Sequence, residues 1–542
     1  MKNIKYLLIS CCAFVSACDD FLVENPQTSV MKDGVYNSLS SAEAVLNGCY
    51  STMEAYNGYA FNYFHVLNVT SGMGVSLMSN DVNLTTMNIL PSNVNMTNTY
   101  TAMYKTIMVA NDIIDGMKSS AIEDGVDKNR IQGEAYFIRA VTYFNLVRLF
   151  GKVSLITEPV TNYAEVQKPR EEIEKVYTQI LFDLDKAWSL LPEKADKVDG
   201  RPYKYAAKAV RAKVYLTLAG NMTEAETDYW QKCYDDAFDV YHNGGYELVH
   251  PYSKLFGSEN KNNAESVFEI QFSSAVNSGR LTETTFPVGH DLMSNIPTQG
   301  KSWGKTRPLQ RAFDQFEAGD PRREVAFVYE SYNNIYESGN KKKVMLYPSV
   351  KGDGNGAYKQ GDSEYPAWKK YYDTSMTAEA SSANFVYMRF ADVVLILAEA
   401  ANELTEHQSD AVGYLNKILT RAADANGNGM RDADEIVPAD VDASMSKEDL
   451  REKIFRERLK EFTGECDEWY TIRRRGESYL RKIMQEHNDK INQLYGNSEL
   501  PKFVYKYNIT DDNVKKNMLM PFPQDEITRN ENISQEEQNF GY

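Results

Sequence analysis

The sequence predicts a mainly α-helical protein in which paired helices flank an irregular, loop-rich segment. Three observations support this fold class. Between Glu43 and Tyr241, most segments repeat apolar residues at steps of three and four. In residues 243–384, glycine and proline become more frequent and the helical spacing fades. From Phe385 the helical spacing returns. We therefore divide the chain into residues 1–17, 18–242, 243–384 and 385–542.

Residues 1–17 have the pattern of a targeting segment and do not belong to the fold. Lys2 and Lys5 precede a short apolar stretch, and Ser16-Ala17-Cys18 then places a cysteine after two small residues. This end resembles the lipobox of bacterial lipoproteins, with an ordinary secretory cleavage site as the alternative. No later run approaches the ~20 apolar residues that a membrane-spanning helix needs.

The first half of residues 18–242 contains two predicted helices separated by loops. Glu43 to Met53 and Thr99 to Met117 show helical spacing of apolar residues. The intervening residues 57–93 are rich in Asn, Gly, Ser and Thr and show little periodicity. We expect loops there.

The stretch from Gly133 to Pro159 predicts the central helix of the protein. Apolar residues occupy almost its whole circumference, which is typical of a helix buried between neighbours. Its charged residues Glu134, Arg139 and Arg148 then need internal partners, because an unpaired buried charge is costly. Gly151 can adopt the left-handed conformation that closes a helix.

Further helices follow as pairs. Arg170 to Leu191 and Tyr203 to Leu218 form one predicted pair, and Tyr229 to Tyr241 completes another hairpin. The lengths are similar to those of tetratricopeptide helices, although the usual repeat consensus is absent. Such pairs bury their apolar faces only by stacking on one another.

Residues 243–384 are too long for one structureless loop, so we expect an irregular subdomain there. Ser266 to Phe272 alternates like a strand. The segment also contains aromatic residues that suit a binding surface: Trp303, Trp368, Tyr371 and Tyr372.

The C-terminal region begins with a helical pattern that carries charges inside an apolar run. Arg389, Asp392, Glu399 and Asn402 are among them, and pairing with one another explains them better than catalysis does. Asp410 to Arg421 predicts the partner helix. Ser446 has the sequence of an N-cap for a third helix.

Residues 424–435 fit the pattern of an EF-hand calcium loop without a mismatch. Pro438 cuts off the exit helix, so a complete EF-hand pair is not expected. The alternative is a solvated Asn-Gly turn with scattered acids. The loop predicts a structural Ca²⁺ site with six ligand positions: Asp424, Asn426, Asn428, Met430 through its carbonyl, Asp432 and Glu435.

Charge, cysteines and motifs limit the possible functions. A formal net charge of −17 disfavours nucleic acid and anionic lipid as partners. Cys49, Cys233 and Cys466 remain after Cys18, and their number and spacing indicate neither a disulfide framework nor a zinc site. The nucleophile elbow, the P-loop and the dinucleotide fingerprint are all missing. We therefore expect no enzyme and no catalytic cofactor.

Five blocks of the sequence, in order, resemble the SusD/RagB family of outer-membrane nutrient-binding lipoproteins. They are the opening after Cys18, the helix from Gly133, the helix from Arg389, the segment from Glu457 to Gly476 and the C-terminal end. The second block is the most specific, through Glu134, Ala135, Phe137, Arg139, Ala140, Tyr143, Phe144 and Gly151. The fourth departs from the family, with Cys466 in place of glycine, Glu468 in place of arginine and Thr471 in place of aspartate.

The resemblance implies a TPR-like αα-superhelix carrying a loop-rich ligand-binding subdomain. It also implies cleavage before Cys18, acylation of that cysteine and display on the outer membrane, anchored only through lipid. The implied role is capture of oligosaccharides and their delivery to a SusC-like TonB-dependent transporter. Peptide capture, as in the RagB-like branch, and adhesion or assembly are the alternatives.

The expected glycan site combines aromatic faces with a few polar groups. Trp303 and Trp368, followed by Tyr371 and Tyr372, are the candidates for stacking on sugar rings. Asn80 and Asp81, in the early loop where the family builds part of its site, are the polar candidates.

Overall fold

The computed structural model describes residues 32–221, 227–276, 278–286, 290–291, 302–333, 342–345, 365–373, 376, 379–501 and 503–542. The predicted signal segment 1–17 and the predicted lipidation residue Cys18 lie outside these residues. Among the helices that are described, none combines the length and the apolar character needed to cross a bilayer.

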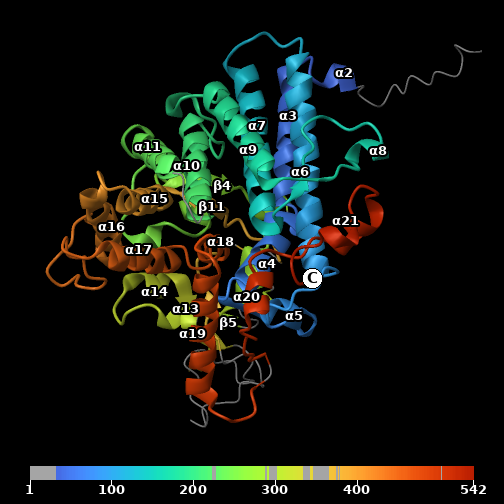
Figure 1. Ribbon diagram of the computed structural model, residues 1–542. Helices are drawn as coiled ribbons and strands as arrows, with labels where there is room; N and C mark the ends of the chain where they lie inside the picture. Colours follow the sequence, from blue (N-terminus) through green and yellow to red (C-terminus); the bar gives the residue numbers. More distant parts are fainter. Residues whose placement is uncertain are drawn as a thin grey trace, which may run out of the picture.

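Long helices form a stack that follows the order of the chain (Figure 1). Each one packs against the next, so neighbours in sequence are neighbours in space. This arrangement confirms the mainly α, TPR-like fold. In the first half the helices are α3 (Leu39–Glu54), α6 (Val94–Lys118), α7 (Val126–Phe150), α9 (Ile173–Leu190), α10 (Lys204–Asn221) and α11 (Thr227–Asn243).

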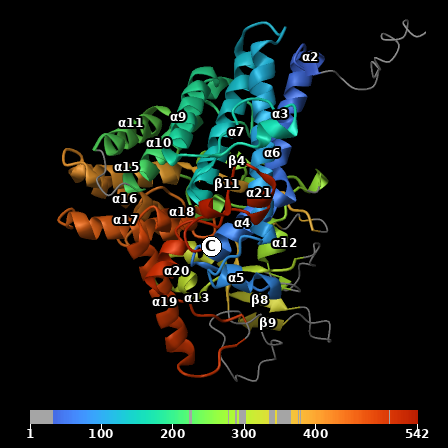
Figure 2. The ribbon, with the colours of Figure 1, turned by 45° about the vertical axis from the view of Figure 1, so that its right-hand side comes forward.

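The C-terminal region continues the same stack, because α11 packs against α15. Figure 2 shows these later helices fanning away from α7 on one side of the molecule. They are α15 (Phe390–Glu403), α16 (Gln408–Ala423), α17 (Lys447–Glu461), α18 (Asp467–Arg473) and α19 (Glu477–Tyr495). Ser446 accepts a hydrogen bond from the Asp449 backbone N–H, which confirms it as the N-cap of α17.

Short helices connect and cover the stack. They are α2 (Lys32–Val35), α4 (Asn62–Thr70), α5 (Val82–Thr85), α8 (Tyr163–Val166), α12 (Leu281–Thr285), α13 (Gln310–Asp314), α14 (Pro321–Ala326), α20 (Asp511–Lys516) and α21 (Gln524–Arg529).

Helix α7 occupies the predicted central place, and most of its residues are buried. Of its three predicted buried charges, Arg139 and Glu134 have charged internal partners, whereas Arg148 donates only to neutral groups. Arg139 pairs with Asp183 of α9 at 2.7 Å, and Glu134 accepts hydrogen bonds from Tyr50 at 2.7 Å and Arg130 at 2.8 Å. Gly151 ends the helix, as predicted, with a positive φ of +69°, but its ψ of −121° differs from that of the left-handed helical conformation.

The irregular region folds as small antiparallel sheets laid on the stack. Strand β4 (Ser266–Ile270) pairs with β11 (Phe385–Arg389), which joins the two ends of the region. Helix α15 therefore begins only at Phe390, and the expected helical start at Phe385 is a strand. The other pairs are β1 (Gly74–Ser76) with β6 (Thr306–Pro308), β2 (Val153–Ser154) with β3 (Arg170–Glu171), β10 (Ala367–Trp368) with β7 (Phe327–Val328), and β8 (Glu330–Asn333) with β5 (His290–Asp291) and β9 (Lys342–Met345).

The prediction of loops throughout residues 57–93 is wrong. Helix α4 lies inside this range, and every one of its residues is buried, including Asn62, His65 and Asn68. A helix buried on all sides needs no single apolar face, so the spacing of apolar residues did not reveal it.

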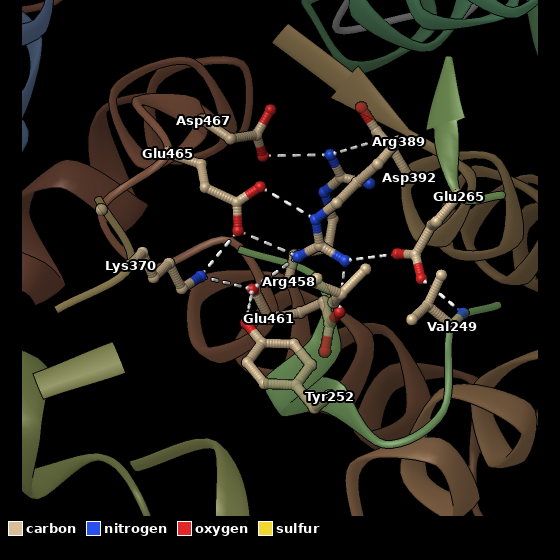
Figure 3. A network of polar contacts seen from close by, with 12 residues as sticks. Val249, Tyr252, Glu265, Lys370, Arg389, Asp392, Arg458, Glu461, Glu465 and Asp467 are labelled. Atoms are coloured by element: carbon tan, nitrogen blue, oxygen red, sulfur yellow. Dashed lines mark hydrogen bonds and ion pairs between the residues drawn. The ribbon is translucent and has the colours of Figure 1, made fainter. Parts of the chain in front are cut away.

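A network of buried ion pairs joins the strands to the C-terminal helices (Figure 3). Arg389 donates to Glu265 at 2.7 Å, to Glu461 at 2.6 Å and to Glu465 at 2.9 Å, and it is only 2% exposed. Lys370 donates to the same Glu465 at 2.6 Å. Since α17 contributes Glu461 and β4 lies next to Glu265, the network fixes the irregular region on the stack.

A second part of the network lies beside the first. Asp392 accepts hydrogen bonds from Arg458 at 2.8 Å and from Lys213 at 2.7 Å, and both cations also contact Asp467. Arg389 and Asp392 are both paired, but not with one another. The expected mutual pairing within this helix is wrong, because their partners come from other elements. Breaking such a buried pair by removing one partner costs about 3–5 kcal/mol, so these charges are structural ties.

Candidate functional site

An exposed tryptophan marks one surface of the irregular region. Trp303 is 49% exposed, and it precedes β6. Its backbone N–H donates to the carbonyl oxygen of Glu283 at 2.7 Å, and the N–H of Gly304 donates to the same oxygen at 3.2 Å. Because Glu283 lies in α12, the indole is held at the edge of that helix.

A second exposed ring lies near the same helix. Tyr56 is 51% exposed and stacks on Phe61 with 4.7 Å between ring centroids; Phe61 in turn stacks on His65 at 5.1 Å. The rings thus form a continuous stack from the surface to α4. Partial burial and then the nearby Glu283 carboxylate raise the pKa of the Tyr56 hydroxyl, which indicates that this ring lies close to α12.

Charged side chains frame the two rings. Arg280 donates to Glu379 at 2.7 Å and to Glu283 at 3.3 Å. Lys305 lies 4.8 Å from the centroid of the Trp303 ring, within the range of a cation–π contact. Partial burial raises the pKa of Glu283, and the Arg280 guanidinium opposes this effect. Together these groups offer donors and acceptors around the ring faces.

The predicted polar residue Asn80 lies at the same edge. Strand β1 pairs with β6 so that Ser76 is opposite Thr306, and the Leu77 N–H donates to the Lys305 carbonyl at 2.8 Å. Because the two strands are antiparallel, the chain after β1, which carries Asn80, and the chain before β6, which carries Trp303, lie at the same end of the ribbon. Asn80 is exposed, and Figure 2 shows α4, α5 and α12 together on that side of the molecule.

Asp81 is an anchor of this surface rather than part of it. Only 2% of the residue is exposed, and its carboxylate contacts His65 at 2.8 Å, Ser76 at 3.2 Å and Asn95 at 3.3 Å. A carboxylate with three internal partners has no free oxygen facing solvent. This corrects its assignment as a ligand contact, because its role is to position the turn that carries Asn80.

The remaining predicted aromatic residues do not form an open surface. Trp368 and Tyr371 are each 1% exposed, and Trp368 stacks on Phe327 with 5.3 Å between centroids. Tyr372 is half-buried and packs against Phe286. In this structure neither Trp368 nor Tyr371 has a free ring face, which corrects their assignment to the stacking surface. The pairing of β10 with β7 draws this segment into the core.

Sequence reasoning missed Tyr56, Arg280, Glu283, Lys305 and Glu379. Tyr56 lies just before the range 57–93, which showed little periodicity. The other four carry charges that are ordinary for any surface. No motif connects them, because α12 and the segment before β6 bring them together only in the fold. We call Tyr56, Asn80, Arg280, Glu283, Trp303, Lys305 and Glu379 the aromatic surface.

The predicted calcium loop at residues 424–435 folds through internal hydrogen bonds. Asp424 accepts the backbone N–H groups of Gly427 at 2.6 Å and Gly429 at 2.9 Å, and it contacts His250 at 2.5 Å. Glu435 accepts the N–H of Ala425 at 2.8 Å. The side-chain oxygens have the chemistry that calcium prefers.

The geometry of this loop does not show a metal site. No group of three or more His, Cys, Asp or Glu side chains within the described ranges is arranged to hold a metal ion. Calcium binding by the loop therefore stays a prediction. The side-chain oxygens of the loop are of the kind that calcium prefers, but the structure does not place them around one centre.

Two family models match most of the chain. The model of the SusD family matches residues 264–542, and a model described as starch-binding and associating with the outer membrane matches residues 20–216. Among known proteins, the chain is 26% identical to SusD-like protein P2 of Formosa agariphila, over 98% of this chain and 99% of that protein. It is 27% identical to a SusD-like protein of Bacteroides ovatus, over 87% of this chain and 82% of the relative.

Solved structures show the same fold. A SusD homologue from Bacteroides thetaiotaomicron has a TM-score of 0.79 at 22% identity, and the match covers 95% of this chain and 99% of the homologue. A laminarin-binding SusD-like protein has a TM-score of 0.67 at 23% identity, over 93% of this chain and 99% of that protein.

Proposed function

Because the chain belongs to the SusD family, we propose that it is a surface-exposed lipoprotein that captures oligosaccharides at the aromatic surface. Its role is binding rather than catalysis. The observation that carries the proposal is the exposed Trp303 ring, which backbone hydrogen bonds hold at Glu283 of α12, the residue whose carboxylate also acts on the exposed Tyr56. Rings presented in this way suit the apolar faces of sugars.

The polar frame of the aromatic surface supports a sugar ligand. Sugar rings have apolar faces and hydroxyl edges, so a site needs aromatic contact together with donors and acceptors. Arg280, Glu283 and Lys305 provide both kinds of polar group near Trp303. The surface carries cations and carboxylates together and so favours no strongly charged ligand. A neutral or weakly charged glycan fits this balance.

The relatives support the same class of ligand. One structural neighbour is described as laminarin-binding, and one matched family model is described as starch-binding. Laminarin and starch are both polysaccharides. We therefore propose a glycan without naming it.

Anchoring and delivery complete the proposal. Acylation of Cys18 would hold the protein on the outer membrane, facing the outside of the cell, and several acyl chains at ~0.8 kcal/mol per buried methylene make such an anchor effectively permanent. We propose that a SusC-like TonB-dependent transporter receives the captured glycan. The family-model description of association with the outer membrane supports this location.

Affinity electrophoresis against a panel of glycans tests the proposal. Native gels containing soluble polysaccharides should retard the wild-type protein in at least one case, and Trp303→Ala should migrate as it does in a gel without glycan. Phe182→Ala is the matched control, because Phe182 is 48% exposed on α9, away from the aromatic surface.

Two results would count against glycan capture. One is no retardation by any glycan together with binding of mixed peptides, which would favour the peptide-capturing alternative. The other is equal loss of retardation in the Trp303 and Phe182 variants, which would show a general effect of removing surface rings. Co-purification of a transporter with the acylated protein, lost in Cys18→Ala, would test delivery separately.

A further inference from the structure

A cavity on another part of the stack has features of an anion-binding site. Its volume is about 210 Å³, and its walls come from α7, α9, α10, α18 and the segment after α20. It adjoins a groove of about 430 Å³, because Met518 and Leu519 line both. Helices α18 and α20 lie near one another in both views (Figures 1 and 2). None of the residues of the aromatic surface lines this cavity.

Arg473 lines the cavity as a buried cation that has only neutral partners. It is 5% exposed, and its guanidinium donates to the carbonyl oxygens of Asn517 at 2.8 Å and Thr70 at 2.9 Å. It also lies 4.1 Å from the ring centroid of Trp469. Among the described residues, no carboxylate lies within ion-pairing distance of it. Burial lowers the pKa of Arg473 to about 9, as expected for a charge without a counter-ion.

Arg148 is a second, partly buried cation that lacks a carboxylate partner. Its guanidinium lies between the rings of Phe144 and Tyr470, 3.6 Å from each centroid. It donates to the Phe144 carbonyl at 3.0 Å and to the Asn145 side chain at 2.6 Å, and the described residues again supply no carboxylate partner. The two rings and the two hydrogen bonds fix the orientation of the guanidinium. Little conformational freedom is then lost when a ligand binds to it, so the group is pre-organised.

The third arginine that lines the cavity, Arg474, has a carboxylate partner. Arg474 binds Glu399 through two hydrogen bonds, at 2.6 Å and 2.5 Å. A neutralised arginine thus lies directly beside Arg473, whose charge is not neutralised. Because burying an uncompensated charge is costly, Arg148 and Arg473 leave the cavity short of negative charge.

Other donors point to the same kind of ligand. Trp469 also lines the cavity, and its buried Nε1–H has no hydrogen-bond partner within the described part of the chain. The groove next to the cavity is lined by Lys515 and Lys516, with Glu477 as its acidic residue. Cations at the mouth raise the local concentration of anions. The hydrogen-bond donors inside the cavity and the lysines of the groove together favour an anion that carries several acceptor oxygens.

We propose that this cavity binds a small organic anion through a carboxylate, sulfate or phosphate group placed between Arg148 and Arg473. The forked donors of arginine match the oxygens of such groups in pairs. Trp469 and Tyr470 supply ring faces for the body of the ligand. This second site is separate from the proposed glycan-binding surface and does not depend on it.

Calorimetric titration of the wild-type protein tests the proposal. The probes are D-glucuronate, inorganic sulfate and inorganic phosphate at constant ionic strength, with D-glucose as the neutral control. At least one anion should bind, and D-glucose should not bind in this cavity. Binding of glucuronate alone would identify a carboxylate ligand, whereas binding of sulfate or phosphate would identify a tetrahedral oxyanion.

Variants locate the binding. Arg473→Gln should weaken anion binding at least about tenfold, which is the loss expected for one charge-assisted contact of about 1.4 kcal/mol. Leu519→Trp keeps both arginines but fills the space at the junction with the groove, so it should also abolish binding, and it serves if Arg473→Gln does not fold. Arg529→Gln removes an equal charge from an exposed position and should leave the anion affinity unchanged.

Three results would overturn the second site. The first is no heat of binding with any of the three anions. The second is binding that persists at full strength in both Arg473→Gln and Leu519→Trp. The third is equal weakening in Arg529→Gln, which would indicate a non-specific effect of net charge. If no glycan retards the protein in native gels, the expected anion binding is unchanged, because the cavity and the aromatic surface share no residue.

Discussion

Trp303 and Glu283 are joined through the backbone: the N–H of Trp303 donates to the carbonyl oxygen of Glu283 at 2.7 Å. The N–H of Gly304 shares that oxygen at 3.2 Å, so the segment before β6 is tied to α12 by two bonds. The position of the indole therefore depends on the main chain rather than on packing of the ring. Its side chain can be changed without disturbing what holds the segment.

We expect Trp303→Ala to weaken glycan binding by about 2 kcal/mol, roughly a 30-fold rise in the dissociation constant, as for an aromatic hot spot. The melting temperature should stay close to that of the wild type, because the ring is half exposed. Isothermal titration with the glycan that retards the protein most would measure the first effect, and calorimetric melting the second. An unchanged affinity would remove Trp303 from the site.

Trp368 should behave in the opposite way. It is 1% exposed, it stacks on Phe327, and it packs against the backbone of Gly464. Trp368→Ala would leave a cavity in the core and should lower the free energy of unfolding by about 3–5 kcal/mol. Urea denaturation followed by fluorescence measures this. Normal stability combined with lost glycan binding would restore Trp368 to the stacking surface.

The sequence predicted most of the long helices because they stack face to face. Helices α6, α7, α9 and α10 each bury a broad apolar side, and that burial imposes the spacing that can be read from the chain. Helix α4 escaped detection because it is surrounded on all sides and buries Asn62, His65 and Asn68 as well.

The candidate site could be predicted only in part. Trp303 and Trp368 come from the same irregular region and have the same chemistry, yet one is exposed and the other is in the core. The difference arises from the pairing of β10 with β7, a long-range contact that no local pattern encodes. Tyr56 comes near Glu283 of α12 for a similar reason: the two residues are far apart in sequence, and only the fold brings them together.

The three residues near Cys466 that depart from the family motif are accommodated by local contacts in this structure. Cys466, at the position where the family has glycine, has a left-handed conformation with φ of +67°. Thr471 donates to Asp467 at 2.7 Å, and Glu468 accepts the N–H of Gly464 at 2.6 Å. Arginine and aspartate of the family motif are both replaced, so neither charge is left without the other. One oxygen of Glu468 is buried without a hydrogen bond from the described residues.

Glu468 makes the stability of the protein depend on pH. Burial raises its pKa from 4.5 to about 8, so the folded protein keeps this carboxyl protonated at neutral pH. The unfolded chain ionises above pH 4.5, so the stabilisation is complete below that pH and is lost as the pH rises toward 8. Glu468→Gln removes this titration and should raise the free energy of unfolding at pH 8 by roughly 2–4 kcal/mol.

Urea denaturation at pH 4.5, 6 and 8 would measure the effect. The variant and the wild type should agree at the lowest pH and separate as the pH rises. Glu406→Gln, at an exposed position, should follow the wild type throughout. A constant difference at every pH would show that the Glu468→Gln substitution acts through packing instead.

Internal hydrogen bonds hold the shape of the loop at residues 424–435. Backbone N–H groups occupy both oxygens of Asp424 and Oε1 of Glu435, and His250 contacts Asp424 as well. Burial acts to raise the pKa of Asp424, but hydrogen bonds from His250 and the glycine N–H groups outweigh it, and the net pKa is lowered. Asp424 is therefore an ionised carboxylate, and a cation would have to displace some of these hydrogen bonds from its oxygens.

We expect Ca²⁺ to raise the melting temperature through this loop. With the weak affinity of extracellular calcium modules, ~10⁻³ M, a concentration of about 10 mM adds roughly 1.4 kcal/mol to the free energy of unfolding. Differential scanning calorimetry with Ca²⁺, with Mg²⁺ and after chelation measures this, and Glu435→Gln should abolish the response to Ca²⁺ because it removes the bidentate ligand. An identical melting temperature in all three conditions would exclude calcium and leave the loop as an Asn-Gly turn closed by its own hydrogen bonds.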